Sequence, residues 1–317
     1  MSDTQAVVIL TDPFDVTSDL VVRELDRRGA RVFRCDTGDF PQELHLAVTL
    51  DNGWSGQLHD DARTLDLADV GCVYYRRPSQ FILPEQMTSP ERKFAAAEAR
   101  MGFGGVISSL ERWINHPSAN AYATIKPVHL AVANACGLNV PPTLITNIPD
   151  KVKEFVGNFG KVVYKTLSTP AFSESSDVKM IYSSIVDPAT IDDSVKLTSH
   201  LFQAWVEKDF EVRLTVVDDE FFAARIDAES CDAGIDWRSD YSNLKYSTAV
   251  VPDAVRNAVS GLLSRLNLRF AAIDFIVTAD GDWVFLDLNP NGQWAWIEDE
   301  TGLPIAAAIA DALIRIR

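Results

Sequence analysis

The sequence predicts an α/β (α+β) protein with more than one domain. Its 317 residues are enough for two or three domains of ordinary size. The chain opens with QAVVILTDPFDVTSDLVVRELDRRGARVFRCD, whose pattern is strand, loop, helix, strand. Such a βαβ opening favours a parallel sheet, because parallel strands need a crossover connection. The C-terminal part instead holds apolar runs joined by short polar turns, which is typical of antiparallel hairpins.

The opening unit can be divided at individual residues. Residues 6–10 form an apolar run typical of a strand, and Thr17-Ser18-Asp19 offers a cap for the following helix. Gly29 ends that helix, and residues 31–35 begin the next strand. These boundaries predict the βαβ unit.

The rest of the first domain contains a hairpin, a strand and a long helix. HLAVTLDNGWSGQLH indicates a hairpin that turns at Asn52-Gly53. CVYYRRP indicates a strand ended by Pro78. From residue 89 to Trp113 the apolar spacing is helical, with Pro90 in the first turn, where proline is tolerated.

The remaining chain alternates helices with strands. The elements we expect are a helix from Pro127 to Cys136, a helix in PDKVKEFVGNFG, a strand in KVVYKTL, a hairpin near Asp218-Asp219, an amphipathic helix in PDAVRNAVSGLLSRLNL and a last helix ending at Arg317. Residues 229–250 have little periodicity and indicate a functional or flexible loop. The predicted domains are residues 1–117, 118–205 and 206–317.

The composition excludes several functions. A formal net charge of −16 argues against general nucleic-acid binding, which needs a basic surface. No apolar run reaches membrane-spanning length, and the first five residues lack the basic start of a signal peptide. The cysteines are far apart and form no CxxC pair, which favours reduced thiols and a cytoplasmic protein: Cys35, Cys72, Cys136 and Cys231.

Common catalytic motifs are absent. GFGGVIS at residues 102–108 lacks the dinucleotide-fingerprint spacing and lies in a helical pattern, so it indicates helix packing. The chain contains no GxxxxGK[ST] and no GxSxG. Its histidines are scattered, which argues against hydrolase and zinc sites: His45, His59, His116, His129 and His200.

Two carboxylates interrupt the apolar runs of FAAIDFIVTADGDWVFLDLNPNGQW. Asp280-Gly281 is a two-residue hairpin signal. With those residues as the loop, Val277 pairs with Val284 and Asp274 pairs with Asp287, their Cβ atoms roughly 5 Å apart. The two acids are therefore expected to face each other on neighbouring strands.

The paired carboxylates suggest a metal site. Like charges so placed repel, and Asn289 falls on the same face as Asp287 because side chains alternate along a strand. These hard oxygen ligands suit Mg²⁺, which typically takes one or two carboxylates together with substrate phosphates. The alternative is a solvated hairpin face with Asp274 simply exposed.

Two lysines lie where a phosphate would explain them. Lys165 interrupts an apolar strand, where a lysine is costly unless it is paired or bound to an anion. Lys126 precedes Pro127 at a helix start, where a phosphate would suit both the lysine and the helix dipole. The alternative is that each lysine extends its ammonium to the surface.

FQAWVEKDFEVRLTVV indicates a hinge between two lobes. Residues 203–206 (Gln203, Ala204, Trp205 and Val206) form a short extended run that can offer backbone groups to a purine, and Lys208 follows. Glu211 can accept hydrogen bonds from ribose hydroxyls, and Arg213 lies on its face of the strand. The alternative is a surface ion pair between Glu211 and Arg213.

Further arginines are candidates for binding phosphate or a substrate carboxylate, since guanidinium groups hold both in bidentate fashion. Arg225 lies in a strand, and Arg238 lies in the loop GIDWRSDYSN, where a solvated arginine is the alternative. Arg76 and Arg77 end a strand of the first domain, at the edge that faces the ligand crevice in open α/β sheets.

In their order along the chain, these residues resemble the ATP-grasp superfamily over roughly residues 115–300. KPVHLAVANACGLNVPPTLITN, VVYKTL, FEVRLTVV, DWR, LDLNPNGQWAWIE and YYRRP resemble more narrowly the graspetide synthetases, the microviridin-type ribosomal peptide maturases. The resemblance implies an N-terminal βαβ pre-ATP-grasp domain, a central domain and a C-terminal antiparallel-sheet domain, with ATP between the last two.

The resemblance also implies a role for each matching position. The implied roles are ATP phosphates for Lys126 and Lys165, adenine for residues 203–206, ribose for Glu211, magnesium for Asp274, Asp287 and Asn289, and the γ-phosphate and acyl phosphate for Arg213 and Arg238. Asp287 departs from the glutamate common in ATP-grasp enzymes, and TLSTPAF lacks the glycines usual in the phosphate-covering loop. Arg225 matches no family motif.

The expected activity is ATP-dependent macrocyclisation of a ribosomal precursor peptide with a leader and an acidic, Thr-rich core. An Asp or Glu side chain would become an acyl phosphate, and a Ser or Thr hydroxyl or a Lys amine would displace the phosphate. Arg76, Arg77 and Arg238 are the candidate substrate contacts, and the resemblance implies a homodimer. Two alternatives remain: a carboxylate–amine ligase that adds free amino acids, and an ATP-binding scaffold without turnover.

Overall fold

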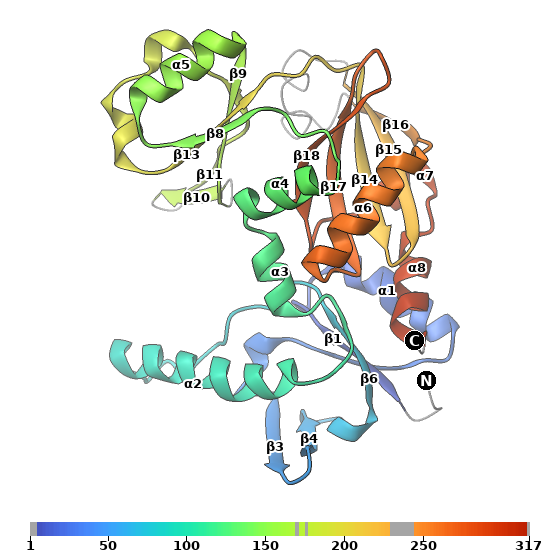
Figure 1. Ribbon diagram of the computed structural model, residues 1–317. Helices are drawn as coiled ribbons and strands as arrows, with labels where there is room; N and C mark the ends of the chain where they lie inside the picture. Colours follow the sequence, from blue (N-terminus) through green and yellow to red (C-terminus); the bar gives the residue numbers. More distant parts are fainter. Residues whose placement is uncertain (1–4, 169–170, 175–176, 229–243, 316–317) are drawn as a thin grey trace.

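The computed structural model describes residues 5–168, 171–174, 177–228 and 244–315, and Figure 1 shows the arrangement of its elements. The N-terminal part contains β1 (Ala6–Leu10), α1 (Val16–Arg27), β2 (Arg31–Cys35), β3 (His45–Leu50), β4 (Trp54–His59), β5 (Thr64–Asp66), β6 (Val70–Tyr75), α2 (Ser89–Ser108) and β7 (Trp113–Ile114). Its main sheet has the order β2-β1-β6-β7, and all its strand pairs are parallel. The predicted βαβ opening is therefore confirmed.

The local chemistry of this domain explains its boundaries. Asp15 caps α1 by accepting a hydrogen bond from the N–H of Thr17. The predicted β3–β4 hairpin is confirmed, with Asn52 and Gly53 both at positive φ in its loop. The predicted long helix is wrong at its end, because α2 stops at Ser108. Trp113, expected in that helix, instead begins β7, a buried edge strand beside β6.

The central part is a small four-stranded sheet with one long helix against it. It contains α3 (Pro117–Ala123), α4 (Lys126–Ala135), β8 (Thr143–Thr146), α5 (Pro149–Phe159), β9 (Val162–Lys165), β10 (Ala171–Glu174), β11 (Asp177–Met180), β12 (Ser184–Ile185) and β13 (His200–Ala204). The sheet order is β12-β9-β13-β8, and β10 pairs with β11 in a separate hairpin. The helices predicted at α4 and α5 and the strand predicted at β9 are confirmed.

The C-terminal part is a five-stranded antiparallel sheet. It contains β14 (Phe210–Val217), β15 (Glu220–Ala228), β16 (Leu244–Thr248), α6 (Asp253–Leu266), β17 (Phe270–Val277), β18 (Trp283–Asn289), α7 (Ala295–Thr301) and α8 (Ile305–Ile314), and the sheet order is β16-β15-β14-β17-β18. The hairpin predicted near Asp218-Asp219 is confirmed, and these two residues form its loop, since Val217 pairs with Glu220.

The predicted loop of residues 229–250 is wrong in part. Residues 244–248 form β16, which pairs with β15 at the edge of the sheet. Residues 229–243 lie outside the described residues. Sequence periodicity missed β16 because its side chains are half-buried or exposed, so no apolar alternation marks it.

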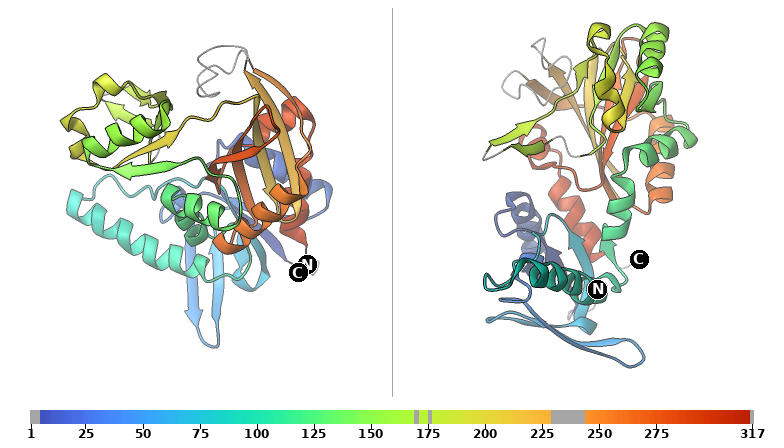
Figure 2. Two further views of the ribbon diagram at one scale, coloured as in Figure 1. Left: turned by 45° about the horizontal axis from the view of Figure 1, so that its top comes forward. Right: turned by 90° about the vertical axis from the view of Figure 1, so that its left-hand side faces the viewer.

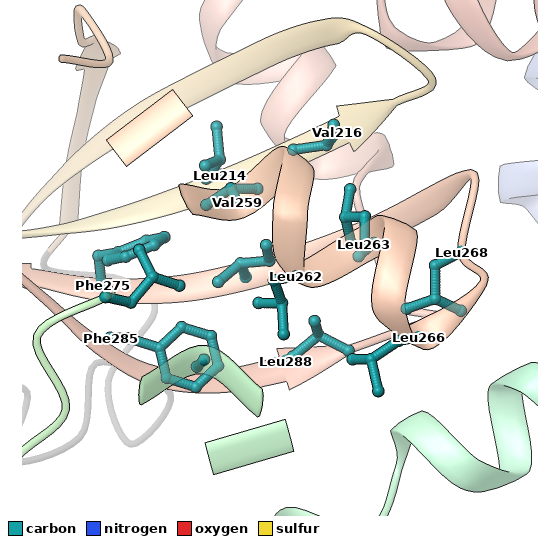
Figure 3. Packing of buried hydrophobic residues seen from close by; sticks show 14 of the residues in the cluster. Leu214, Val216, Val259, Leu262, Leu263, Leu266, Leu268, Phe275, Phe285 and Leu288 are labelled. Atoms are coloured by element: carbon teal, nitrogen blue, oxygen red, sulfur yellow. The ribbon is translucent and has the colours of Figure 1, made fainter. Parts of the chain in front are cut away.

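The two faces of the C-terminal sheet are covered by different helices. Apolar residues of α6 pack onto Leu214, Val216 and Phe285 of one face (Figure 3). Residues of α3 and α4 join this same cluster, so both helices pack on the C-terminal sheet. The other face meets α7 and α8, and α8 also packs against α1 of the N-terminal part (Figure 1). The three predicted domain ranges stay a prediction.

Four short 3-10 turns complete the described elements: Thr37–Asp39, Leu67–Asp69, Pro188–Thr190 and Asp193–Leu197. Figure 2 shows the β3–β4 hairpin projecting from one end of the molecule and the central sheet at the opposite end.

Among the described residues, no helix is both long and apolar enough to cross a membrane. Cys35, Cys72 and Cys136 are free thiols, and Cys231 lies outside the described residues.

Candidate active site

A cavity of about 630 Å³ lies between the central sheet and the C-terminal sheet. That volume is typical of a small-molecule site. The cavity brings together most of the residues singled out in the sequence, which are Lys126, Lys165, Gln203, Ala204, Trp205, Val206, Glu211, Asp274, Asp287 and Asn289, together with Arg77 from the N-terminal domain. Of the other predicted site residues, Arg76, Lys208, Arg213 and Arg225 are not in its lining.

The two strand carboxylates face each other as predicted, since Asp274 of β17 pairs directly with Asp287 of β18. The loop length and the register next to the loop, however, differ from the predicted ones. Val277 pairs with Trp283 rather than with Val284, so the loop spans the five residues 278–282. A β-bulge at Leu286, which has no partner in the register, then restores the pairing of the two acids.

The protein's own cations hold both carboxylates. The Lys126 Nζ donates to Asp287 Oδ2 at 2.6 Å, and His129 Nε2 lies 3.0 Å from Asp287 Oδ1. Arg213 Nη1 donates to Asp274 Oδ1 at 2.7 Å. The predicted repulsion is therefore neutralised within the chain, and repulsion by itself does not demand a metal.

Asp287 stays ionised in this environment. Burial raises its pKa, but the nearby charges of Lys126 and His129 lower the pKa more, to a net value below the ordinary 3.8. Its side chain keeps 31% of its surface open toward the cavity, although protein atoms surround it closely. An ionised oxygen ligand therefore faces the cavity.

His129 is a site residue that the sequence analysis missed, because it was grouped with scattered histidines. Its Nδ1 lies 2.9 Å from the carbonyl oxygen of Ala123, so Nδ1 carries the proton and donates. Its Nε2 consequently points at Asp287. The spacing contained the signal, because residues three apart on a helix share a face, and His129 follows Lys126 by three.

The donor set fits magnesium. Asp274 and Asp287 supply carboxylate oxygens from neighbouring strands, and Asn289 follows on the same face, where it pairs with Ala272. Among the described residues no group of three or more His, Cys, Asp and Glu side chains could hold a metal alone. A magnesium ion here would therefore take its remaining ligands from elsewhere, as magnesium does when phosphates complete its shell.

The opposite wall comes from the central sheet. Lys165 of β9 donates from Nζ to Gln203 Oε1 at 2.7 Å, and Gln203 Nε2 donates to Thr143 Oγ1 at 3.1 Å. Trp205 is braced by Lys161, whose Nζ lies 3.7 Å from the ring centroid. The predicted hinge residues 203–206 all line the cavity, at the exit of β13.

Glu211 and Arg213 do not pair with each other. Glu211 is buried in the cavity wall and forms an ion pair with Lys208. Arg213 pairs with Asp274 instead, and its Nη2 donates to the carbonyl oxygen of Gln293 at 3.2 Å. The alternative of a Glu211–Arg213 surface pair is wrong, because both side chains are buried with other partners.

The two consecutive arginines have different surroundings. Arg77 lines the cavity, and its pKa is lowered by burial and by neighbouring Arg76. Arg76 is 0% exposed, and it donates to Asn291 and Gln293. The predicted substrate contact of Arg76 is therefore corrected, because alternation along the strand end turns it inward while Arg77 faces the cavity.

The predicted catalytic role of Arg225 is also corrected. Arg225 pairs across the sheet with Val212, so it lies on the face opposite Arg213. Its guanidinium stacks on the Phe210 ring at 3.8 Å and pairs with Asp227, whose hydrogen bond raises the pKa of Arg225. Arg238 lies outside the described residues, and its predicted role stays a prediction.

The chain is similar to known proteins over its full length. The family model described as the MvdD pre-ATP grasp domain matches residues 6–121. The crystal structure of macrocyclase MdnB from Microcystis aeruginosa MRC is 30% identical, with a TM-score of 0.80, and covers 98% of this chain and 99% of that one. No curated protein matches the chain.

Two further structures align with this chain. Macrocyclase MdnC from Microcystis aeruginosa MRC, bound with precursor peptide MdnA, is 29% identical, with a TM-score of 0.86, and covers 98% of this chain and 99% of that one. A Chryseobacterium gregarium RiPP-associated ATP-grasp ligase, in complex with ADP and a leader and core peptide, is 26% identical, with a TM-score of 0.90 and coverages of 98% and 96%. With a lysine-flanked cavity between two lobes and a near full-length relative at 30% identity, the chain belongs to the graspetide-type ATP-grasp synthetases and is an ATP-dependent ligase.

Proposed function

We propose that this ligase closes side-chain ester or amide rings within a ribosomal precursor peptide. The observation that carries the proposal is a single cavity that has Asp274, Asp287 and Lys126 on one wall and Lys165 on the other. This arrangement suits a nucleotide whose phosphates lie between two lysines and a magnesium ion. The peptide complex of MdnC supports a peptide as the substrate class.

The reaction has two steps. A carboxylate oxygen of the peptide attacks the γ-phosphorus of ATP, the bond to the β-phosphate oxygen breaks, and ADP leaves. A Ser or Thr hydroxyl, or a Lys amine, then attacks the acyl carbon, loses its proton and releases inorganic phosphate. The protein supplies positioning and charge rather than a nucleophile of its own.

Different cavity residues bind different parts of the nucleotide. Residues 203–206 border the adenine, and Glu211 accepts hydrogen bonds from the ribose. Lys126 and Lys165 bind the phosphates. Asp274, Asp287 and Asn289 would hold magnesium, which would neutralise charge on the phosphates when bound.

Arginines serve the transferred group and the acidic peptide. Arg213, buried beside Asp274, and Arg238 steady the γ-phosphate and the acyl phosphate. Arg77 lines the cavity just after the end of β6, so its guanidinium can reach a bound ligand. A cation in that position suits the carboxylate of an acidic core peptide, in a chain whose net charge is −16. The enzyme works as a homodimer in the cytoplasm under this proposal.

The test is a reaction of the protein with ATP, magnesium and a candidate precursor peptide that has a leader and an acidic, Thr-rich core. The expected product has lost one water per ring, as measured by intact-mass spectrometry. A gain of one residue's mass would identify ligation to a free amino acid instead. Nucleotide binding without phosphate release would identify a scaffold.

The matched variants are Asp287→Asn and Asp282→Asn. Asp287→Asn should bind ADP yet form no product, because it removes an ionised ligand. Asp282 is an exposed residue in the loop of the β17–β18 hairpin, and Asp282→Asn should retain full activity. Retained product formation by Asp287→Asn would contradict the assigned role.

A further inference from the structure

Residues 289–293 form a compact turn between β18 and α7, hereafter the Asn-rich loop. The N–H of Asn291 donates to Asn289 Oδ1 at 3.1 Å, and the N–H of Gly292 donates to the Asn289 carbonyl at 3.2 Å. The loop begins at the proposed magnesium ligand Asn289. Its position therefore sets where that ligand lies.

Arg76 grips this loop from the N-terminal domain. Its Nη1 donates to the Asn291 carbonyl oxygen at 2.6 Å and to Asn291 Oδ1 at 2.9 Å, and its Nη2 donates to Gln293 Oε1. Asn291 Nδ2 donates back to the Arg76 carbonyl. Arg76 is fully buried and its partners are half-buried, so these hydrogen bonds to a charged group are strong.

Arg76 is itself fixed from behind by the start of α1. Its Nε lies 3.7 Å from Asp15 Oδ2. Asp15 accepts hydrogen bonds from Ser18 Oγ at 2.6 Å and Thr11 Oγ1 at 3.0 Å. Burial raises the pKa of Asp15, but Ser18 and Arg76 lower the pKa more, so Asp15 stays ionised. The guanidinium therefore has a defined position.

A second buried side chain holds the same loop. Asn115 is 3% exposed, and its Nδ2 donates to the carbonyl oxygens of Pro290 at 2.9 Å and Phe270 at 2.8 Å. Its Oδ1 accepts the N–H of Phe270 at 2.9 Å. Asn115 thus ties the loop to the start of β17, the strand that carries Asp274.

The loop in turn supports Arg213. Arg213 Nη2 donates to the Gln293 carbonyl at 3.2 Å, while its Nη1 holds Asp274. A Cβ added at Gly292 would lie 2.8 Å from Arg213 Nη2 and would collide with Ala272. The guanidinium is therefore packed directly on the loop backbone, and a moved loop moves Arg213.

We infer that Arg76 is a positioning residue, through which the N-terminal domain fixes Asn289 and Arg213 relative to the nucleotide phosphates. Without the guanidinium, the carbonyl oxygen and Oδ1 of Asn291 lose the donor that holds them, and Gln293 Oε1 keeps only the hydroxyl of Thr17. The loop is then held less tightly, because these hydrogen bonds to a charged group are lost. Lysine keeps the charge but lacks the planar fork that reaches Asn291 and Gln293 together. This inference rests on the proposed magnesium site.

The test compares Arg76→Lys with the wild-type chain in ADP binding, measured by calorimetry with and without magnesium. The ADP affinity without magnesium should stay within about twofold, because the adenine and ribose contacts are remote from the loop. The magnesium-dependent gain in ADP affinity should fall by roughly tenfold or more, as expected when support for a metal ligand is lost. Arg23→Lys, at an exposed position of α1, is the matched control and should behave as wild type.

Hydrogen exchange of residues 289–293 supplies a readout that needs neither magnesium nor peptide. Arg76→Lys should raise exchange in this loop, while exchange in α5 of the central sheet stays unchanged. Should Arg76→Lys fail to fold, Asn291→Ala removes the two side-chain hydrogen bonds between Asn291 and Arg76 and should give the same pattern more weakly, because the backbone carbonyl of residue 291 and Gln293 still accept from Arg76. The double variant should resemble Arg76→Lys, because the contacts that Asn291→Ala removes are among those that depend on Arg76.

The inference would be overturned if both single variants kept the wild-type effect of magnesium on ADP affinity and also kept wild-type hydrogen exchange in residues 289–293. A wild-type enzyme whose ADP affinity ignores magnesium would instead refute the metal assignment. Loop exchange alone would then decide whether Arg76 holds the loop.

Discussion

Asp287 is the residue whose charge the site depends on most. Its carboxylate is ionised beside Lys126 and His129, and burial opposes that charge. Because its folded-state pKa lies below the ordinary value, the ionised carboxylate stabilises the fold at neutral pH. That stabilisation is present above the unfolded-state pKa and is lost as the pH falls toward the folded-state pKa.

A pH series can measure this contribution. The difference in free energy of unfolding between wild type and Asp287→Asn should be constant near neutral pH. It should shrink as the pH falls below about 4, where the unfolded carboxylate takes up a proton. Urea unfolding between pH 7 and pH 3 gives the difference. A difference that grows on acidification would show that the folded-state pKa is raised instead.

The sequence identified site residues whose type conflicts with their local pattern. Lys165 and Asp274 stand in apolar strands, and both line the cavity. Arg76 stands in a similar position, yet its charge is used inside the protein, on Asn291. Only the tertiary fold decides whether such a charge faces a ligand or another segment of the chain, so the residue type alone could not separate Arg76 from Arg77.

The β17–β18 hairpin and its following loop form the element on which the site is built. Alternation predicted that Asp274, Asp287 and Asn289 share a face, and the register agrees. The bulge at Leu286 was not predictable, because a bulge leaves no mark in the polar and apolar pattern. The loop is longer than the Asp280-Gly281 signal indicated, which shifts the register near the loop by one residue. The bulge shifts the register back by one residue, so the pairing of Asp274 with Asp287 is nevertheless as predicted.

Gly292→Ala tests how tightly this loop is packed. The new Cβ would collide with Ala272 and press on Arg213, so the loop or the guanidinium must move. We expect ATP turnover to fall by roughly a hundredfold, since displacements near 1 Å have effects of that size. The measurement is phosphate release under saturating ATP, with the fold checked by circular dichroism.

Gly102→Ala is the matched control. Gly102 lies in α2, and nothing lies within 4 Å of its added Cβ. Alanine there should keep turnover and raise the free energy of unfolding by about 0.5–1 kcal/mol, because glycine is costly inside a helix. Equal loss of turnover in both variants would contradict the packing argument.

The protein as a whole is held together by a core shared between its ends. Residues of β1, α1 and β6 pack with Trp294, Ile305 and Ile309 of the C-terminal part in one buried cluster. Arg28, the C-cap residue of α1, also pairs with Asp311 of α8 at 2.7 Å. A shared core of this kind couples the stability of the N-terminal domain to that of the C-terminal sheet.

Ile309→Ala should therefore destabilise both parts together. Removing a fully buried isoleucine side chain costs about 2–5 kcal/mol. We expect thermal unfolding at a lower temperature and still in one transition for both parts, measured by calorimetry. Val250→Ala, at a position that is 91% exposed, should leave the unfolding temperature unchanged. A separate early transition confined to the N-terminal domain would argue against a common core.

The place of α8 has a consequence for biosynthesis. During translation the parallel sheet leaves the ribosome first, while the helix that packs against α1 is made only after β18 and α7. The apolar flank of the nascent N-terminal domain therefore stays uncovered until α8 has emerged. Slow or interrupted synthesis of this enzyme should consequently make it dependent on chaperones that shield such surfaces.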